Sequence, residues 1–165
     1  MRDSEEAQAP PEDLADALAG EERYAEATSL LETETTRQRE TFGPMHPLPP
    51  WLASDLADDL RYQQKYGDAE AVLRRQIEVV QNEERRGMLP RLLYELASVQ
   101  TEMGKKDDAL RSLKQALDLG YISMAGEGLA RDHNFASLKG DSRFQALVEE
   151  NRRNLEAARK KPIIE

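Results

Sequence analysis

Hydrophobic residues recur along this chain at helical spacing, most clearly in the stretch GKKDDALRSLKQAL from Gly104 to Leu117. A glycine and a charged turn come first. The apolar residues that follow fall on one face of a helix: Ala109, Leu110, Leu113, Ala116 and Leu117. We therefore predict an amphipathic helix here, with small residues on its buried face.

The same pattern occurs twice more, in YAEATSLL from Tyr24 and in YGDAEAVL from Tyr66. Aligning the three stretches on their alanines gives spacings of 42 and 40 residues: Ala27, Ala69 and Ala109. A Leu-Ala pair lies twelve to thirteen residues before each: Leu14-Ala15, Leu56-Ala57 and Leu96-Ala97. Small residues at such positions let two antiparallel helices approach closely. The sequence therefore predicts three repeated units of two helices and a short turn.

Over residues 12–120 this pattern resembles the tetratricopeptide repeat, and the joint FGPMHP (Phe42–Pro47) resembles the longer repeats of kinesin light chain type. The resemblance implies an all-α fold, a right-handed α-solenoid of about three helix pairs. Two residues depart from the repeat, because Glu34 and Gln76 stand where Ala116 stands in the third unit. The first helix is also short, and we expect it to start near Pro10-Pro11.

The last third resembles the closing segment of many bacterial tetratricopeptide proteins. The residues that carry this likeness are Asp132, Phe135, Leu138, Asp141, Arg143 and Phe144. We expect residues 121–155 to form a cap whose apolar side chains cover the end of the third unit: Phe135, Leu138, Phe144, Leu147 and Val148. Asp141 is placed to be the N-cap of the last helix. Residues 1–11 are expected to be a flexible acidic N-terminus, and residues 156–165 an exposed tail.

Charge is distributed unevenly in this 165-residue chain of net charge -9. Residues 1–60 hold four basic and fifteen acidic residues, whereas residues 61–165 hold nineteen basic and seventeen acidic. The acidic half argues against nucleic acid and favours a protein or peptide partner with Lys or Arg. No apolar run approaches the roughly 20 residues that span a bilayer, and no secretory signal opens the sequence, so we expect a cytoplasmic protein and no membrane contact.

The family resemblance implies that the first helix of each pair lines a concave groove, where extended peptides bind. Carried over to this sequence, the predicted partner-binding residues are Asp16, Trp51, Asp55, Asp58, Tyr62, Arg91, Tyr94, Glu95 and Glu102. Acids and aromatics suit a cationic peptide through charge pairing and cation–π contact. Two alternatives stay open: the acids form an ordinary solvated helix face, and Trp51 staples the loop before it onto the second unit.

No motif predicts catalysis, a metal or a cofactor. The sequence has no cysteine, and its two histidines, His46 and His133, lie far apart in predicted loops. The Gly-Lys pair in MGKKDD lacks the remainder of a phosphate-binding loop. We interpret the chain as a non-catalytic adaptor, scaffold or sensor segment of a bacterial signalling protein that binds a basic or extended peptide. The alternative is a structural spacer or self-association module, and a homo-oligomer is left open.

Overall fold

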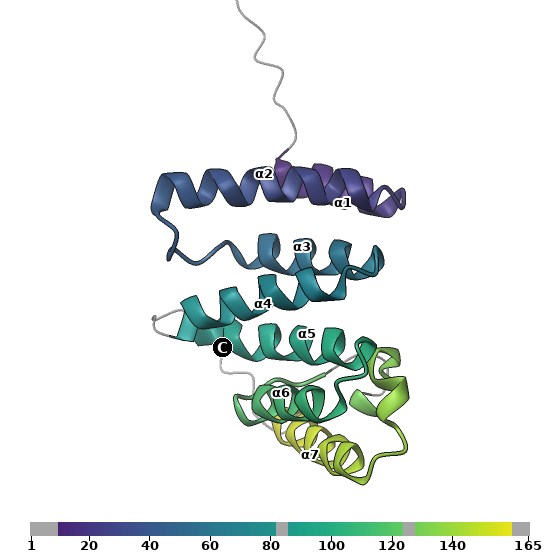
Figure 1. The fold of residues 1–165 in the computed structure, drawn as a ribbon. Coiled ribbons are helices and arrows are strands. Elements are labelled where there is room, and N and C mark those ends of the chain that lie inside the picture. The colour runs from purple at the N-terminus through teal and green to yellow at the C-terminus, as the bar shows by residue number, and fades with distance from the viewer. Residues whose placement is uncertain (1–9, 82–85, 124–127, 160–165) are drawn as a thin grey trace, which may run out of the picture. The chain divides into compact units, whose positions relative to one another are not determined.

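The computed structural model describes residues 10–81, 86–123 and 128–159, and every regular element in these ranges is a helix (Figure 1). The α-helices are α1 (Pro11–Gly20), α2 (Tyr24–Phe42), α3 (Pro50–Tyr62), α4 (Tyr66–Gln81), α5 (Leu89–Glu102), α6 (Lys106–Asp118) and α7 (Ser142–Arg159). Short 3-10 helices are η1 (Arg86–Met88), η2 (Leu129–Arg131) and η3 (His133–Leu138). The predicted all-α class is confirmed. The expectation for residues 1–9 lies outside the described residues.

Prolines fix where the first helix of each pair begins. Pro11, Pro50 and Pro90 each occupy the first or second position of their helix, α1, α3 and α5. Proline suits these positions because its φ is already helical and the first N–H groups of a helix have no intrahelical acceptor. The first helix therefore starts at Pro11, where the sequence placed its start.

The turn inside each pair has one geometry in all three repeats. The second residue after the first helix has a positive φ: 59° at Glu22, 60° at Gln64 and 73° at Gly104. Its N–H donates to a carbonyl three residues back, and the next N–H donates to a carbonyl five residues back, as in Lys105 to Gln100 at 2.9 Å. This is the Schellman arrangement of a helix end, and it reverses the chain for the second helix.

The chain divides into two compact units, Met1–Val72 and Leu73–Glu165. In the first unit α2 packs against both α1 and α3. The side-chain amide of Gln63 ties the end of α3 to α2 by donating to the carbonyl of Tyr24 at 3.1 Å and to Thr28 Oγ1 at 2.7 Å. Ala15 and Ala27 are buried, as the close approach of α1 and α2 requires.

Glu34 stands where the third repeat has an alanine, and a local ion pair stabilises its carboxylate. Glu34 is buried on α2, yet its carboxylate accepts hydrogen bonds from Arg37 at 2.5 and 2.7 Å and from Gln38 at 2.7 Å. The Arg37 guanidinium holds the pKa of this carboxyl below its usual value. A buried charge is tolerated when it is paired and hydrogen-bonded, so the first unit keeps the repeat without an alanine here.

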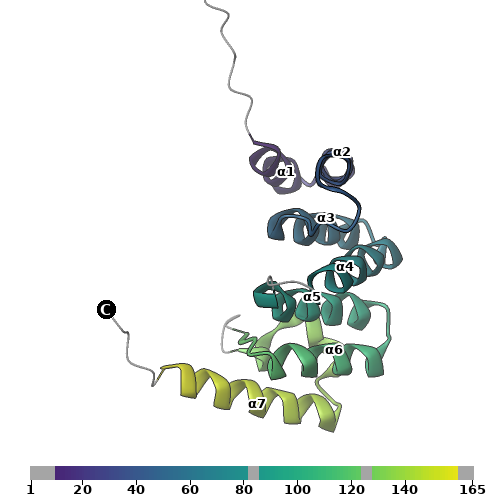
Figure 2. The same ribbon diagram turned by 90° about the vertical axis from the view of Figure 1, so that its left-hand side faces the viewer.

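In the second unit α5 pairs with α6, and α7 packs against α6 (Figure 2). The core combines Ala97, Ala109, Leu113 and Leu117 of the repeat with Leu129, Phe135, Leu138, Phe144 and Leu147 of the closing segment. Val148 packs against the same core. The closing segment therefore covers the third helix pair with its aromatic and leucine side chains.

Asp141 caps α7 as the sequence predicts. Its Oδ1 accepts the backbone N–H of Arg143 at 2.9 Å, and the Arg143 side chain also donates to it. These bonds lower the pKa of Asp141 to about 2, with the Arg143 side chain as the main cause. Arg143 further pairs with Asp107 of α6 at 2.7 Å. The helix itself runs to Arg159, past Leu155, with the side chains of residues 156–159 exposed.

Candidate functional site

Four aspartates of the first unit gather where α1 meets α3. Asp55, Asp59 and Tyr62 follow one another at i, i+4 and i+7 on α3, so they share a helix face. Asp58 precedes Asp59, and Asp16 comes from α1. The charges of Asp55, Asp58 and Asp16 all act on the carboxyl group of Asp59. We call these four residues the aspartate cluster.

Asp59 is the buried member of the aspartate cluster. Only 4% of its surface is exposed, and its Oδ2 is buried with no hydrogen-bond partner among the described residues. Burial raises the pKa of Asp59 to about 6, and the negative charges of Asp55, Asp58 and Asp16 add to the effect. The group therefore changes charge close to neutral pH.

Two tyrosines stand beside the aspartate cluster. The rings of Tyr24 on α2 and Tyr62 on α3 stack with centroids 4.8 Å apart and planes 16° apart. Tyr62 is 59% exposed, which makes it one of the most exposed large apolar residues in the described ranges. Removal from water raises the pKa of Tyr24, and Glu22, Tyr62 and Asp59 contribute further. The Tyr24 hydroxyl thus lies within electrostatic reach of the buried carboxyl group.

One cation of the chain already lies at this surface. Arg61 pairs with Asp58 at 3.2 Å, and its guanidinium carbon lies 5.3 Å from the centroid of the Tyr62 ring. At this distance the Arg61 guanidinium makes a cation–π contact with the Tyr62 ring. Arg61 offsets part of the negative charge that the aspartate cluster carries.

The structure therefore brings four predicted site residues of the first unit together: Asp16, Asp55, Asp58 and Tyr62. Trp51 lies one helical turn before Asp55 on α3 and is half-buried. The predicted set lacks two residues, Asp59 and Tyr24. The i, i+4, i+7 spacing of Asp55, Asp59 and Tyr62 is the signal that indicates Asp59, whereas the stacking of Tyr24 on Tyr62 depends on how α2 packs against α3.

In the second unit, Arg91 and Glu95 contact each other, and Tyr94 contacts the closing segment. Arg91 pairs with Glu95 along α5 at 2.7 Å. The Tyr94 hydroxyl donates to Asp132, and its ring stacks on Tyr121 with centroids 4.4 Å apart. Glu102 is exposed near the end of α5. Tyr94 thus has a structural contact that the sequence pattern did not indicate, because Asp132 lies thirty-eight residues away.

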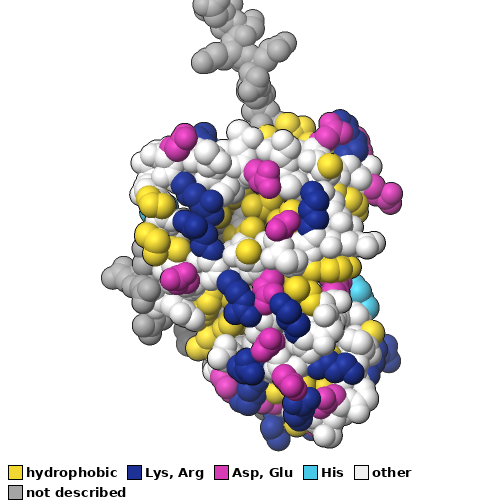
Figure 3. Space-filling model, viewed as in Figure 1, with side chains coloured by type: hydrophobic (Ala, Val, Ile, Leu, Met, Phe, Trp, Pro, Cys, Tyr) yellow, Lys and Arg dark blue, Asp and Glu magenta, His cyan; other side chains and the backbone are white. Residues whose placement is uncertain are grey.

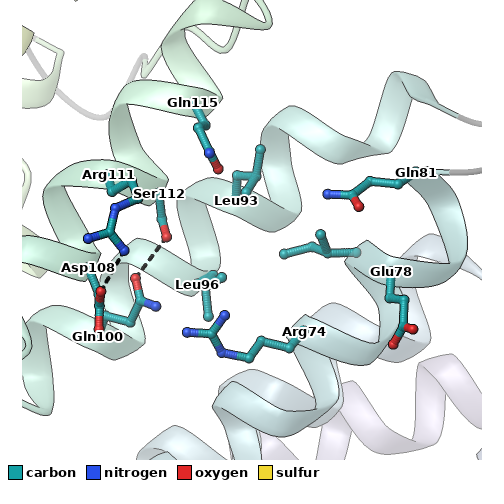
Figure 4. A pocket seen from close by; sticks show the side chains of 11 residues that line it. Arg74, Glu78, Gln81, Leu93, Leu96, Gln100, Asp108, Arg111, Ser112 and Gln115 are labelled. Atoms are coloured by element: carbon teal, nitrogen blue, oxygen red, sulfur yellow. Dashed lines mark hydrogen bonds and ion pairs between the residues drawn. The ribbon is translucent and has the colours of Figure 1, made fainter.

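A cavity of about 320 Å³ lies within the second unit (Figure 4). Its lining includes Ile77 of α4, Leu93 and Leu96 of α5, and Arg111 and Ser112 of α6. The Ser112 hydroxyl donates to Gln100 at 2.8 Å, and Arg111 donates to Asp108 at 2.8 Å. The lining mixes leucines with both signs of charge and defines no particular ligand chemistry.

Elsewhere charges of opposite sign are interspersed. Figure 3 shows Lys and Arg side chains among Asp and Glu side chains over α6 and α7. Ion pairs account for part of this mixture, including Lys114 with Glu150 at 3.4 Å and Arg152 with Glu149 at 2.9 Å. The aspartate cluster differs, because its charges are of one sign apart from Arg61.

Within the described ranges, no group of three or more His, Asp or Glu side chains is arranged to hold a metal ion. No helix there is both long enough and apolar enough to cross a membrane. The aspartate cluster and its tyrosines combine negative charge with an aromatic face, and this chemistry suits a cationic group.

Paired helices with buried alanines at a regular spacing define a helical repeat protein. The tetratricopeptide repeat model matches residues 8–82 and again residues 50–120, which together cover most of the chain. The chain belongs to the tetratricopeptide repeat family. Repeats of this family are generally protein–protein interaction modules and are typically non-catalytic. No curated protein matches the chain.

Proposed function

We propose that this chain is a non-catalytic adaptor whose first unit binds an extended, Lys- or Arg-containing segment of a protein partner along α1 and α3. The observation that carries the proposal is the convergence of Asp16, Asp55, Asp58 and Asp59 beside the stacked Tyr24–Tyr62 pair. For the second unit, Arg91, Tyr94, Glu95 and Glu102 remain a separate prediction of partner-binding residues.

The physical basis is attraction between fixed negative charge and a cationic side chain that leaves water. A cation over a tyrosine ring contributes about 0.5–2 kcal/mol, depending on how far it is desolvated. Exposed ion pairs contribute about 0.2–1 kcal/mol each, so several acids must act together to hold an extended peptide. Four aspartates from two helices, with one of them buried, meet this requirement.

The test uses a short fluorescein-labelled Gly/Ser peptide that carries several lysines, with fluorescence anisotropy as the measurement. Charge reversal at Asp55→Lys with Asp58→Lys should weaken binding by about tenfold or more, because it places two cations where the peptide's cations are expected. Circular dichroism and thermal unfolding check that the double variant keeps its fold.

The matched control is Glu32→Lys with Glu40→Lys, which reverses two exposed acids of α2 and changes the net charge by the same amount. This variant should bind the peptide nearly as tightly as the wild type. If both double variants lose affinity equally, binding follows net charge alone and the proposed site is wrong.

A further inference from the structure

Exposure falls stepwise across the aspartate cluster. Asp16 is exposed, Asp55 and Asp58 are half-buried, and Asp59 is buried. Asp59 is therefore the least accessible of the four acids, and its neighbours in the cluster are nearer to solvent. The ring of Tyr62 is exposed and stacked on Tyr24.

One oxygen of the Asp59 carboxyl group, Oδ2, is buried and has no hydrogen-bond donor among the described residues. The nearby cation, Arg61, makes its ion pair with Asp58. A buried carboxylate without a donor is costly, so the group is either protonated or paired with a cation from elsewhere.

We propose that Asp59 is the centre of a subsite for one cationic side chain of the partner, a Lys ammonium or an Arg guanidinium, with Tyr24 and Tyr62 against its aliphatic stem. This subsite rests on the proposed function, since it assigns one side chain of the bound segment to one carboxyl group. An ammonium brings three donors and a guanidinium five, so either supplies the hydrogen bond that Asp59 Oδ2 lacks.

Binding at this subsite is coupled to proton release. The groups that face Asp59 are Asp16 from α1, Tyr24 from α2, and Asp55, Asp58 and Tyr62 from α3, with Arg61 beside Asp58. The free carboxyl group is largely protonated below about pH 6, and a bound cation requires the carboxylate. Affinity therefore falls as the pH drops through this range, by up to about tenfold per pH unit for one displaced proton.

The experiment measures the affinity of the same lysine peptide at about pH 7.5 and about pH 5, with a norleucine peptide as the uncharged counterpart. Asp59→Asn keeps the shape of the side chain and removes the charge. Glu40→Gln removes one exposed charge from α2 and serves as the matched control. Thermal unfolding checks that each variant is folded.

The wild type and Glu40→Gln should bind the lysine peptide about tenfold more weakly at the lower pH. Asp59→Asn should bind it weakly at both pH values, with a ratio close to one. If Asp59→Asn keeps the affinity and pH dependence of the wild type while Asp55→Lys with Asp58→Lys loses binding, the subsite is overturned and the proposed function stands. If the wild type binds lysine and norleucine peptides alike, both are overturned.

Discussion

At the scale of single residues, burial limits the size of the repeat alanines and changes the pKa of Asp59. Ala27, Ala69 and Ala109 are fully buried, and the repeat pattern alone predicts that they must be small. Asp59 is buried as well, although no hydrophobic pattern marks it. Its burial depends on α1 and α2 packing against α3, so the sequence predicts the aspartates but not which one leaves water.

Asp59 should make the stability of the first unit depend on pH. Its pKa is about 6 in the folded protein and close to 4 in the unfolded chain, so the folded state holds the extra proton between these values. Stability therefore falls as pH rises from about 4 to about 6. Asp59→Asn should raise the free energy of unfolding by about 1–2 kcal/mol at pH 7 and change it little at pH 3.5.

Urea denaturation of both proteins at the two pH values measures this effect. A loss of stability on Asp59→Asn at pH 7 would mean that the carboxylate has a donor in the free protein, and the unsatisfied group would not exist. The same result would also remove the basis for a cation subsite.

At the scale of helices and turns, the repeat register extends beyond the alanines. The residues with positive φ, Glu22, Gln64 and Gly104, are 42 and 40 residues apart, as are the alanines that follow them. The turn is therefore as regular as the helices, although only the third repeat uses the residue type best suited to it. The sequence predicts the turns but not that two of them place a non-glycine residue in the left-handed region.

Replacing Gln64 by glycine should stabilise the protein by about 1 kcal/mol, because an L side chain in the left-handed region costs about that much. Gln64 is exposed, so no packing is lost. The reverse change, Gly104→Ala, is the matched control and should destabilise, since a Cβ there meets nothing within 4 Å and only the φ of 73° opposes it. Both effects are read from urea denaturation, and a neutral Gly104→Ala would contradict this explanation.

The closing segment makes two kinds of contact with the third helix pair, and its sequence pattern predicts only the apolar kind. The sequence predicts that its apolar side chains cover the third helix pair, and they share a core with it. Its polar residues have structural partners in the repeat, since Asp132 accepts from Tyr94 and Arg143 pairs with Asp107. These contacts join residues about thirty-six or more positions apart, so no local pattern predicts them.

At the scale of the whole molecule, the distribution of charge is the basis for placing the proposed basic partner on the first unit. Acids outnumber basic residues strongly in residues 1–60, and the whole aspartate cluster lies within this part of the chain. The surface over α6 and α7 mixes both signs (Figure 3). The excess of acids in the sequence predicts a cationic partner, whereas only the fold brings together the tyrosines and the buried carboxyl group of the proposed subsite.

A map of backbone amide chemical shifts, recorded while the full chain is titrated with the lysine peptide, locates the peptide on the protein. The largest shifts should fall in α1 and α3, around Asp16, Asp55, Asp59 and Tyr62, and the norleucine peptide should cause none of them. Shifts confined to α6 and α7, or equal shifts with both peptides, would contradict the proposed site.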